Sequence, residues 1–423
     1  MAREYKHSGI EWVKQIPSNW NIIKGRHLLF LPNRPVRPTD DVVTCFRDGE
    51  VILRSERRTE GFTMSDKEIG YQGINKGDIV IHGMDGFAGA MGVSKSTGKG
   101  SPVLIVCNPK ENDSPQYIIY YLRSLAMTNV FLALATGIRE RSCDLRWKKI
   151  AELPFLRPSF LEQQRIANYL DKVCGEVDEM IALQEQMIEE LKAYKQSVIT
   201  EAVTKGLNPN APMRDSGIDW IGEVPVHWGK DKIIRIFNLI GSGTTPSSSD
   251  NEAYEGNLNW IQSGDINGGD LFESKNKISE KTLAKYSALT MYDAPFIIIA
   301  MYGASVGNIS ISHINGCVNQ ACCVMSKTKQ EFKYLFYAIK SAKDYLIYKA
   351  VGGGQPNISQ STLKQLWLPI PPLSEQQSIA SYLDTKCAEI DALIAIKQAK
   401  IEELKDYKKS VIYEYVTGKK EVV

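Results

Sequence analysis

Two kinds of polar side chain in this sequence could bind nucleic acid, and they are concentrated in different halves of the chain. Of the 16 arginines, 13 precede residue 159. Arginine can bind guanine through two parallel hydrogen bonds, and it also clamps phosphate groups. For any single arginine, a solvated surface position explains the residue equally well. The candidate DNA-binding residues of this half are Arg54, Arg57, Arg58, Lys95, Lys99, Arg139 and Arg141.

The second half of the chain offers hydroxyl and amide side chains instead. Asparagine and glutamine match the hydrogen-bonding edge of adenine. They are also ordinary turn residues, and for each one alone that explanation is the stronger. The candidate DNA-binding residues of this half are Thr244, Thr245, Asn259, Gln262, Tyr302, Ser305, Asn319, Gln320, Gln355 and Asn357.

Motifs for catalysis or metal binding are not found in the sequence. It contains no GxxxxGK[ST], no GxSxG and no [DNS]-P-P-[YFW] tetrapeptide, and the five histidines have no triad-like context. The eight cysteines form no CxxC pair, so we expect no zinc site and free thiols in a cytosolic protein. Charge interrupts every 18-residue apolar window, and the net charge of +2 excludes neither nucleic acid nor protein partners. We therefore predict no catalytic residue, no metal and no transmembrane span.

The elements that must position the polar residues are duplicated. The segment SGIEW at 8–12 returns as SGIDW at 216–220, a shift of 208 residues. A longer block returns at a shift of 213, where residues 162–204 and 375–417 share 26 identities in 43 positions. Internal similarity of this kind predicts two copies of one unit of roughly 210 residues.

The second part of each copy has the periodicity of a long helix. Pro158 and Pro371 precede the expected starts, and Gly206 and Gly418 follow the expected ends. The spacing predicts a coiled-coil seam of about six heptads in a helix ~64 Å long, with the two copies packed antiparallel. The expected apolar seam positions are 166, 170, 173, 177, 180, 187, 191, 194 and 198, then 379, 383, 390, 393, 401, 404, 407 and 411, with polar positions at Gln184, Lys386 and Lys397.

The first part of each copy has a mixed α/β pattern. In the first copy a strand-like run at 78–81 leads to a Gly-rich stretch and a helix near 115–135. In the second copy the equivalent run is 296–299, followed by 317–325 and a helix near 330–350. We therefore predict α/β domains at 1–158 and 207–371, separated by helices at 159–206 and 372–423, with pseudo-twofold symmetry.

The order of the motifs, twice over, resembles the specificity (S) subunit of Type I restriction–modification systems across nearly the whole chain. The first copy departs from the pattern at 139–142 (RERS), where the second has a Gly-Gln-Pro-Asn loop. The motifs that carry the resemblance are PPLSEQQ at 371–377 with its degenerate copy PSFLEQQ at 158–164, GTTP at 243–246, NWI at 259–261, NQ at 319–320 and GQPNIS at 354–359.

The resemblance implies a non-catalytic protein of a bacterial or archaeal cytoplasm. Its two globular parts would be target recognition domains, each reading one half of an asymmetric, gapped site in double-stranded DNA. The paired helices would set the spacing and dock two methyltransferase (M) subunits, and restriction (R) subunits would join the complex. The chain itself would need no cofactor, because M would use S-adenosylmethionine for adenine methylation and R would use ATP and Mg²⁺.

Two other classes of function remain open. The chain could be a coiled-coil adaptor with two protein-binding heads, which salt-dependent DNA affinity would distinguish from a DNA reader. It could also be a fused nuclease or methyltransferase. Two observations argue against this second alternative. The sequence lacks the [DNS]-P-P-[YFW] tetrapeptide with which an amino-methyltransferase holds its flipped base, and the repeat occupies the whole chain.

Overall fold

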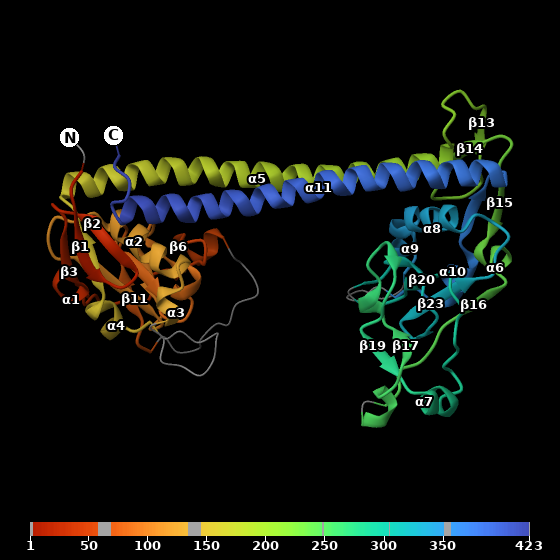
Figure 1. Cartoon of the computed structure of the whole chain (residues 1–423), viewed down its shortest axis with the longest axis horizontal. Helices are drawn as coiled ribbons and strands as arrows, with labels where there is room; N and C mark the ends of the chain where they lie inside the picture. Colours follow the sequence, from red (N-terminus) through yellow and green to blue (C-terminus); the bar gives the residue numbers. More distant parts are fainter. Residues whose placement is uncertain are drawn as a thin grey trace. The chain divides into compact units, whose positions relative to one another are not determined.

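The computed structural model describes residues 3–57, 69–133, 145–247, 249–303, 305–350 and 357–422, which form two compact units. Unit 1 combines residues 1–185 with 398–423, and unit 2 consists of residues 186–397. Each unit contains one globular body of mixed α/β structure and part of both long helices, α5 (Phe160–Lys205) and α11 (Leu373–Val416) (Figure 1). The predicted fold class is confirmed.

The body of unit 1 is built on a four-stranded antiparallel sheet in the order β4-β11-β8-β9. The central strand β8 is buried on both faces, since Ile79 and Ile81 belong to one hydrophobic cluster and Val80 to another. Ser114 caps the helix that covers the first cluster by accepting a hydrogen bond from the amide of Tyr117. The elements of this body are β1 (Tyr5–Ile10), β2 (Val13–Pro17), β3 (Asn21–Lys24), α1 (Gly25–Leu28), β4 (Leu29–Phe30), β5 (Val43–Cys45), β6 (Val51–Leu53), the 3-10 turn η1 (Arg54–Glu56), β7 (Gln72–Ile74), β8 (Ile79–His82), η2 (Gly86–Ala88), β9 (Met91–Val93), β10 (Gly98–Gly100), β11 (Leu104–Pro109), α2 (Pro115–Met127), α3 (Val130–Ala133), α4 (Trp147–Glu152) and β12 (Pro154–Arg157).

The body of unit 2 has a five-stranded sheet in the order β16-β23-β20-β21-β18 and a three-stranded sheet in the order β19-β17-β22. Its central strand β20 also alternates between two clusters, with Ile297 and Ile299 on one face and Ile298 on the other. The elements of this body are β13 (Met213–Asp215), β14 (Glu223–Pro225), β15 (Gly229–Lys232), α6 (Ile233–Ile236), β16 (Leu239–Gly241), η3 (Asn251–Tyr254), β17 (Leu258–Ile261), η4 (Ser263–Asp265), β18 (Asp270–Leu271), β19 (Asn276–Ile278), α7 (Glu280–Lys285), β20 (Phe296–Ala300), β21 (Ile309–Ser312), β22 (Cys317–Val318), β23 (Cys322–Ser326), α8 (Phe332–Ser341), α9 (Lys343–Tyr348), α10 (Gln360–Gln365) and β24 (Trp367–Ile370).

Two of the predicted helices are each broken into two pieces. The helix expected near 115–135 is α2 followed by α3, and Asn129 between them has a left-handed φ of 59° that no helix can continue through. The helix expected near 330–350 is α8 followed by α9, with Ala342 between them at ψ 4°. Periodicity alone did not reveal these breaks, because apolar residues continue on the same face across both of them.

The long helices end where the glycines predicted. Gly206 follows α5 with φ +77°, and Gly418 follows α11 with φ +72°. Only glycine adopts this left-handed conformation at little cost, which is why it commonly terminates helices.

The long helices pair antiparallel within each unit. In unit 1 the Lys408 ammonium lies 2.6 Å from the Asp178 carboxylate, and the ring centroids of Tyr169 and Tyr415 lie 4.5 Å apart. Residue numbers therefore rise along one helix as they fall along the other.

The same ion pair recurs in unit 2. There Lys195 contacts Asp391, again at 2.6 Å. Under the shift of 213 residues, Lys195 is equivalent to Lys408 and Asp391 to Asp178. The duplicated sequence therefore makes a duplicated contact.

The seam differs from the predicted one by one residue in alternate positions. The buried and half-buried seam residues of α5 are 170, 174, 177, 181, 184, 188, 191, 195 and 198, and the equivalent nine residues of α11 lie 213 positions later. The prediction of 180, 194, 393 and 407 was wrong, because these side chains are exposed, whereas the predicted positions 173, 187 and 386 are half-buried beside the seam. Steps of three and four continue through Gln184, which is half-buried in the seam as predicted. The globular body covers the flank that carries Cys174.

Candidate nucleic-acid interface

Several predicted DNA-binding residues of unit 2 meet at one edge of its sheets. Strand β17 runs parallel to β22, with Trp260 opposite Cys317 and Ile261 opposite Val318. Gln262 follows the first strand and Asn319 the second, and the amide of Asn319 donates to the carbonyl of Ile261 at 3.1 Å. Because parallel strands end at the same edge, these two side chains emerge together.

The neighbouring sheet brings further polar residues to this edge. The amide of Met301, just after β20, donates to the carbonyl of Ala321 at 2.7 Å. The next residue, Tyr302, forms an isolated β-bridge with Asn357. The structure thus joins residues from five separate segments. We call Thr245, Gln262, Tyr302, Asn319, Gln320 and Asn357 the polar edge.

Hydrogen bonds already hold part of the polar edge in place. The Thr245 hydroxyl lies 2.5 Å from the Gln320 side-chain carbonyl, and the Asn276 amide donates to the Gln262 side-chain carbonyl at 2.9 Å. Each glutamine therefore uses its side-chain carbonyl as an acceptor, and its NH₂ group is the donor that it can offer to a ligand. Burial raises the pKa of Tyr302, whose hydroxyl stays protonated and able to donate at neutral pH.

The other predicted residues of unit 2 lie beside this edge. Asn259 is half-buried on β17, where it donates to the carbonyl of Asn315 at 2.8 Å and accepts from Ser274 at 3.2 Å. The carbonyl of Thr244 accepts from the indole of Trp260, and Ser305 is half-buried in the turn after Tyr302. Asn259 and Thr244 therefore stabilise the polar edge through contacts within the body.

In unit 1 the predicted basic residues are partly neutralised by acids of the same body. The Arg57 guanidinium lies 2.5 Å from Asp48 and 3.2 Å from Glu50, and Lys95 lies 2.8 Å from Glu50. The hydrogen bond to Asp48 raises the pKa of Arg57. Arg54, in η1, donates to the Thr44 hydroxyl at 3.3 Å. A DNA phosphate would have to compete with these carboxylates.

One predicted contact is corrected by the structure, and four lie outside the described residues. Lys99 is in the short strand β10 and only 6% exposed, so its ammonium cannot reach DNA from the surface. Lys99 stands between two glycines, and the sequence alone did not show that it belongs to a strand. The positions outside the described residues are Arg58, Arg139, Arg141 and Gln355.

A set of exposed residues beside the polar edge was not predicted from the sequence. Strand β19 pairs with β17, placing Lys277 opposite Asn259 and Asn276 opposite Trp260. Lys275, Asn276 and Lys277 are exposed, and neither lysine has an acidic partner among the described residues. The run Lys-Asn-Lys was the available signal, but the distance along the chain concealed its position next to Asn259.

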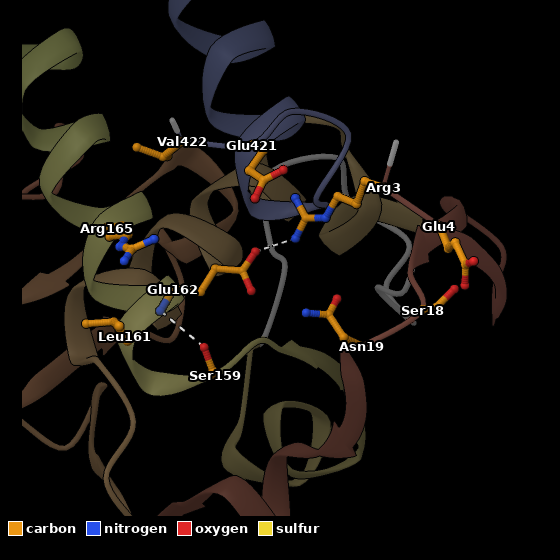
Figure 2. Close-up of a pocket in the computed structure, with 10 residues that line it drawn as sticks. All are labelled: Arg3, Glu4, Ser18, Asn19, Ser159, Leu161, Glu162, Arg165, Glu421 and Val422. Atoms are coloured by element: carbon orange, nitrogen blue, oxygen red, sulfur yellow. Dashed lines mark hydrogen bonds and ion pairs between the residues drawn. The ribbon is translucent and has the colours of Figure 1, made fainter. Parts of the chain in front are cut away.

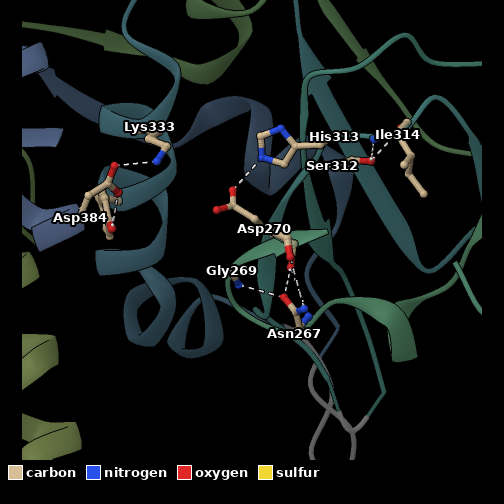
Figure 3. A network of polar contacts seen from close by, with 10 residues as sticks. Asn267, Gly269, Asp270, Ser312, His313, Ile314, Lys333 and Asp384 are labelled. Carbon is tan, nitrogen blue, oxygen red and sulfur yellow. Dashed lines mark hydrogen bonds and ion pairs between the residues drawn. The ribbon is translucent and has the colours of Figure 1, made fainter. Parts of the chain in front are cut away.

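Each body is anchored to its long helix by the same set of contacts. In unit 2 the buried Gln376 side chain accepts from the amide of Glu331 at 2.9 Å and donates to the carbonyl of Pro371 at 2.8 Å. Lys333 of α8 contacts the Asp384 carboxylate at 2.6 Å (Figure 3). The Tyr337 hydroxyl of the same helix donates to this carboxylate at 2.9 Å. These contacts fix the body to the first turns of α11.

In unit 1 the equivalent residues repeat this arrangement. Gln163 accepts from the amide of Ser114 at 2.8 Å, and Tyr120 donates to Asp171 at 2.7 Å. Arg3 forms an ion pair with Glu162 at the start of α5 (Figure 2). The Glu-Gln-Gln motif therefore has a structural role inside each unit.

Further features of the described residues concern membrane-spanning helices, metal sites and cysteine thiols. No described helix is long and apolar enough to cross a membrane, and no three His, Cys, Asp or Glu side chains among the described residues are grouped to hold a metal ion. The described cysteines are free and buried, and burial raises the pKa of Cys45 and Cys322 to about 12. These thiols are inert at neutral pH.

Comparison with known proteins finds similarity to specificity subunits of type I restriction enzymes. Residues 225–406 match the model of the Type I restriction modification DNA specificity domain. The MjaX specificity subunit of a type I restriction enzyme from Methanocaldococcus jannaschii is 26% identical over 366 residues, covering 84% of this chain and 76% of the relative. The MjaVIII specificity subunit from the same organism is 22% identical over 420 residues, covering 96% and 94%.

Solved structures share the fold. A chain from a study of assembly and conformational transition of the type I R-M system matches with a TM-score of 0.74 at 17% identity, covering 95% of this chain and 99% of that one. The HsdS subunit from Thermoanaerobacter tengcongensis matches with a TM-score of 0.52, also at 17% identity, covering 95% and 98%. The resemblance inferred from the motifs is confirmed.

Proposed function

We propose that this chain is the non-catalytic DNA sequence-specificity subunit of a Type I restriction–modification complex. The observation that carries the proposal is duplication at two levels, in the helix repeat and in the contacts that anchor each body to it. Two related bodies with diverged surfaces suit an asymmetric target with two different halves. The matches to specificity subunits support this assignment.

The proposed domains follow the four segments of the sequence. Residues 1–158 and 207–371 are the target recognition domains, and 159–206 and 372–423 are the spacer helices. In the second domain the polar edge reads bases, because its amide and hydroxyl groups suit base edges in the major groove. Lys275 and Lys277 bind neighbouring phosphates, which position the protein without carrying sequence information.

In the first domain the exposed basic residues near β5 and β6 contact DNA. Arg57 and Lys95 would exchange Asp48 and Glu50 for phosphate groups, and this exchange lowers their net contribution to affinity. Arg54, Arg58, Arg139 and Arg141 complete the proposed set in this domain.

The helix pair offers a surface for protein partners on the flank away from the bodies. The bodies are held by Asp171 and Asp384, each of which comes one position after a seam residue. The exposed apolar residues at 180, 194, 393 and 407 each come one position before a seam residue. They therefore lie on the opposite flank of the helix pair. Large apolar side chains are uncommon on a solvated helix. We call this surface the apolar flank; it comprises Met180, Leu183 and Tyr407 in unit 1, and Tyr194, Leu393 and Ile396 in unit 2.

The two halves of the apolar flank are equivalent under the shift of 213 residues, which suits two copies of one partner. We assign them to two M subunits, with R subunits joining the complex. M supplies S-adenosylmethionine chemistry, and R supplies ATP-dependent translocation and cleavage. The apolar flank would equally serve a protein-interaction adaptor, so DNA specificity must be tested directly.

The deciding experiment is a methylome. The chain is co-expressed with its cognate M subunit, and host DNA is sequenced with detection of modified bases. We expect a two-part, gapped adenine motif that is absent from cells with M alone. No new methylation from a soluble chain and a demonstrably active M subunit would contradict the proposal.

A further inference from the structure

Two backbone hydrogen bonds mark the place of the polar edge in unit 2. The amide of Met301, just after β20, donates to the carbonyl of Ala321, and the amide of Ile358 donates to the carbonyl of Met301, both at 2.7 Å. Tyr302 directly follows Met301, and Asn357 directly precedes Ile358. The two bonds therefore fix the point from which these side chains of the polar edge leave the sheet.

The same two hydrogen bonds recur in unit 1, after the equivalent strand β8. The amide of Gly83 donates to the carbonyl of Val103, and the amide of Leu145 donates to the carbonyl of Gly83, both at 2.8 Å. Strand β8 pairs with β9 and β11 as β20 pairs with β21 and β23. Leu145 also precedes Ile358 by 213 residues, which is the shift of the helix repeat. The turn that follows Gly83 is therefore the counterpart of the polar edge.

An arginine and a carboxylate meet at this turn. The Arg47 guanidinium lies 2.8 Å from the Asp85 carboxylate, and the Arg47 side chain is 70% exposed. The amide of Asp85 donates to Nδ1 of His82 at 3.0 Å. Burial lowers the pKa of His82, so its ring is neutral at neutral pH and can accept this bond. The carboxylate thus lies on a turn that a hydrogen bond holds in place, and the guanidinium beside it is open to solvent.

The turn between β5 and β6 carries Arg47 to this position. A Cβ atom at Gly89 would lie only 2.8 Å from the carbonyl oxygen of Arg47, so glycine lets the two turns pack directly against each other. Gly89 also has φ +95°, a conformation that other residues rarely adopt. Arg57, a proposed phosphate contact, binds Asp48 and Glu50 of the same β5–β6 turn. A phosphate contact and a base contact can therefore be neighbours in this domain.

We propose that Arg47 and Asp85 read one G·C base pair in the half-site of the first domain. This inference rests on the proposed function and adds base-reading residues to that domain. In the major groove guanine presents two acceptors that match two arginine donors, and cytosine presents an amino donor that matches a carboxylate. A guanidinium has five N–H donors, so Arg47 can bind Asp85 and guanine together. The carboxylate repels a phosphate, which favours a base pair as the ligand of this ion pair.

The test compares the methylomes of cells in which variants of the full chain are co-expressed with the M subunit. Arg47→Gln removes the guanidinium, and Asp85→Asn removes the carboxylate that would accept from cytosine. Arg26→Gln is the matched control, because Arg26 is half-exposed and pairs with the half-exposed Glu152 in the same body. Fluorescence anisotropy then measures binding of the complex with M to duplexes that carry the motif, or the motif with its G·C pairs replaced one at a time.

We expect Arg47→Gln to lower discrimination at one G·C pair by about tenfold. Asp85→Asn should relax the same position, and Arg26→Gln should leave the motif unchanged. The gap and the other half-site should stay as they are in both variants, which also shows that the variants fold. The affected half-site should be the one that Gln262→Ala leaves unchanged.

Three outcomes would overturn this proposal. They are a motif without a G·C pair, full discrimination retained by both Arg47→Gln and Asp85→Asn, and equal relaxation by Arg26→Gln. In each of these cases the unaltered chain still directs methylation to a gapped motif, so the specificity proposal stands. If the unaltered chain directs no methylation at all, the specificity proposal is contradicted and this inference fails with it.

Discussion

Replacing Gln376 by methionine should loosen the body of unit 2 from the start of α11. The Gln376 side chain is fully buried and makes three hydrogen bonds, to the carbonyl of Pro371, the amide of Glu331 and the side chain of Gln330. Methionine has a similar length and shape but offers none of these bonds. Gln330 is half-exposed and can turn to water, whereas the two backbone groups would lose their partner.

The magnitude follows from the two backbone groups. A buried polar group left without a partner costs about 1–3 kcal/mol, so the two together cost roughly 2–6 kcal/mol. In a domain of this size each kcal/mol lowers the melting temperature by about 2–4 °C. We therefore expect a fall of roughly 10 °C in the transition of unit 2, together with faster hydrogen exchange at the amide of Glu331, which precedes α8.

The matched control is the next residue of the same motif. Gln377 is exposed, so Gln377→Met should change stability by less than about 0.5 kcal/mol. Calorimetry and hydrogen exchange on both variants give the comparison. Equal effects of the two substitutions on stability would refute the assignment of Gln376 as the anchor. A loss of stability in Gln376→Met without faster hydrogen exchange at the amide of Glu331 would refute it as well.

Four further outcomes test the rest of the structure. Inserting four residues into one long helix, about 6 Å, should change the gap in the methylated motif, and an unchanged gap would contradict a spacer role. A double-mutant cycle on Lys195 and Asp391 should give a coupling of about 0.2–1 kcal/mol in the free energy of unfolding, because Asp391 is more than half exposed and solvent screens the pair. A coupling near zero at low salt would mean that the ion pair does not persist in solution. Gln262→Ala should relax sequence preference at one position and cost about 1–3 kcal/mol in binding to the target. Lys277→Gln should weaken binding to all DNA sequences alike and reduce the salt dependence of binding, which competition assays at two salt concentrations measure. Equal effects of the two variants would argue against base reading by the polar edge. Met180→Asp should weaken copurification of the M subunit while leaving DNA binding of the isolated chain intact, and unchanged copurification would remove the apolar flank from the interface.

Local sequence predicted the elements whose causes are local. Gly206 and Gly418 mark the helix ends because only glycine enters the left-handed region cheaply, and that preference belongs to the residue itself. The repeat predicted paired long helices, because one apolar stripe on a helix must be covered. Both inferences hold in the structure.

The phase of the seam was not predictable in the same way. Met180 and Ile181 are both apolar neighbours, and periodicity alone favoured the first of them. The structure half-buries the second and leaves the first exposed, and each body occupies the flank next to Asp171 and Asp384. A contact from a distant segment thus decided which of two adjacent residues faces the partner helix.

The polar edge shows the same division. Composition identified Gln262, Tyr302, Asn319 and Asn357 one by one, each no more persuasive than a loop residue. Their meeting at one edge depends on β17 running parallel to β22 and on the bridge after β20. Lys277 was overlooked and Lys99 was wrongly included, because exposure depends on strand pairing that local composition does not encode.

By itself the sequence determined the duplication, the helix ends and the family resemblance, since these follow from residue identity and spacing along the chain. Tertiary structure alone decided which flank of each helix is covered, which polar residues converge, and why the first glutamine of the Glu-Gln-Gln motif is buried while the second is exposed. Those outcomes depend on hydrogen bonds and packing between segments far apart in the chain, where a one-residue shift exchanges a buried side chain for an exposed one.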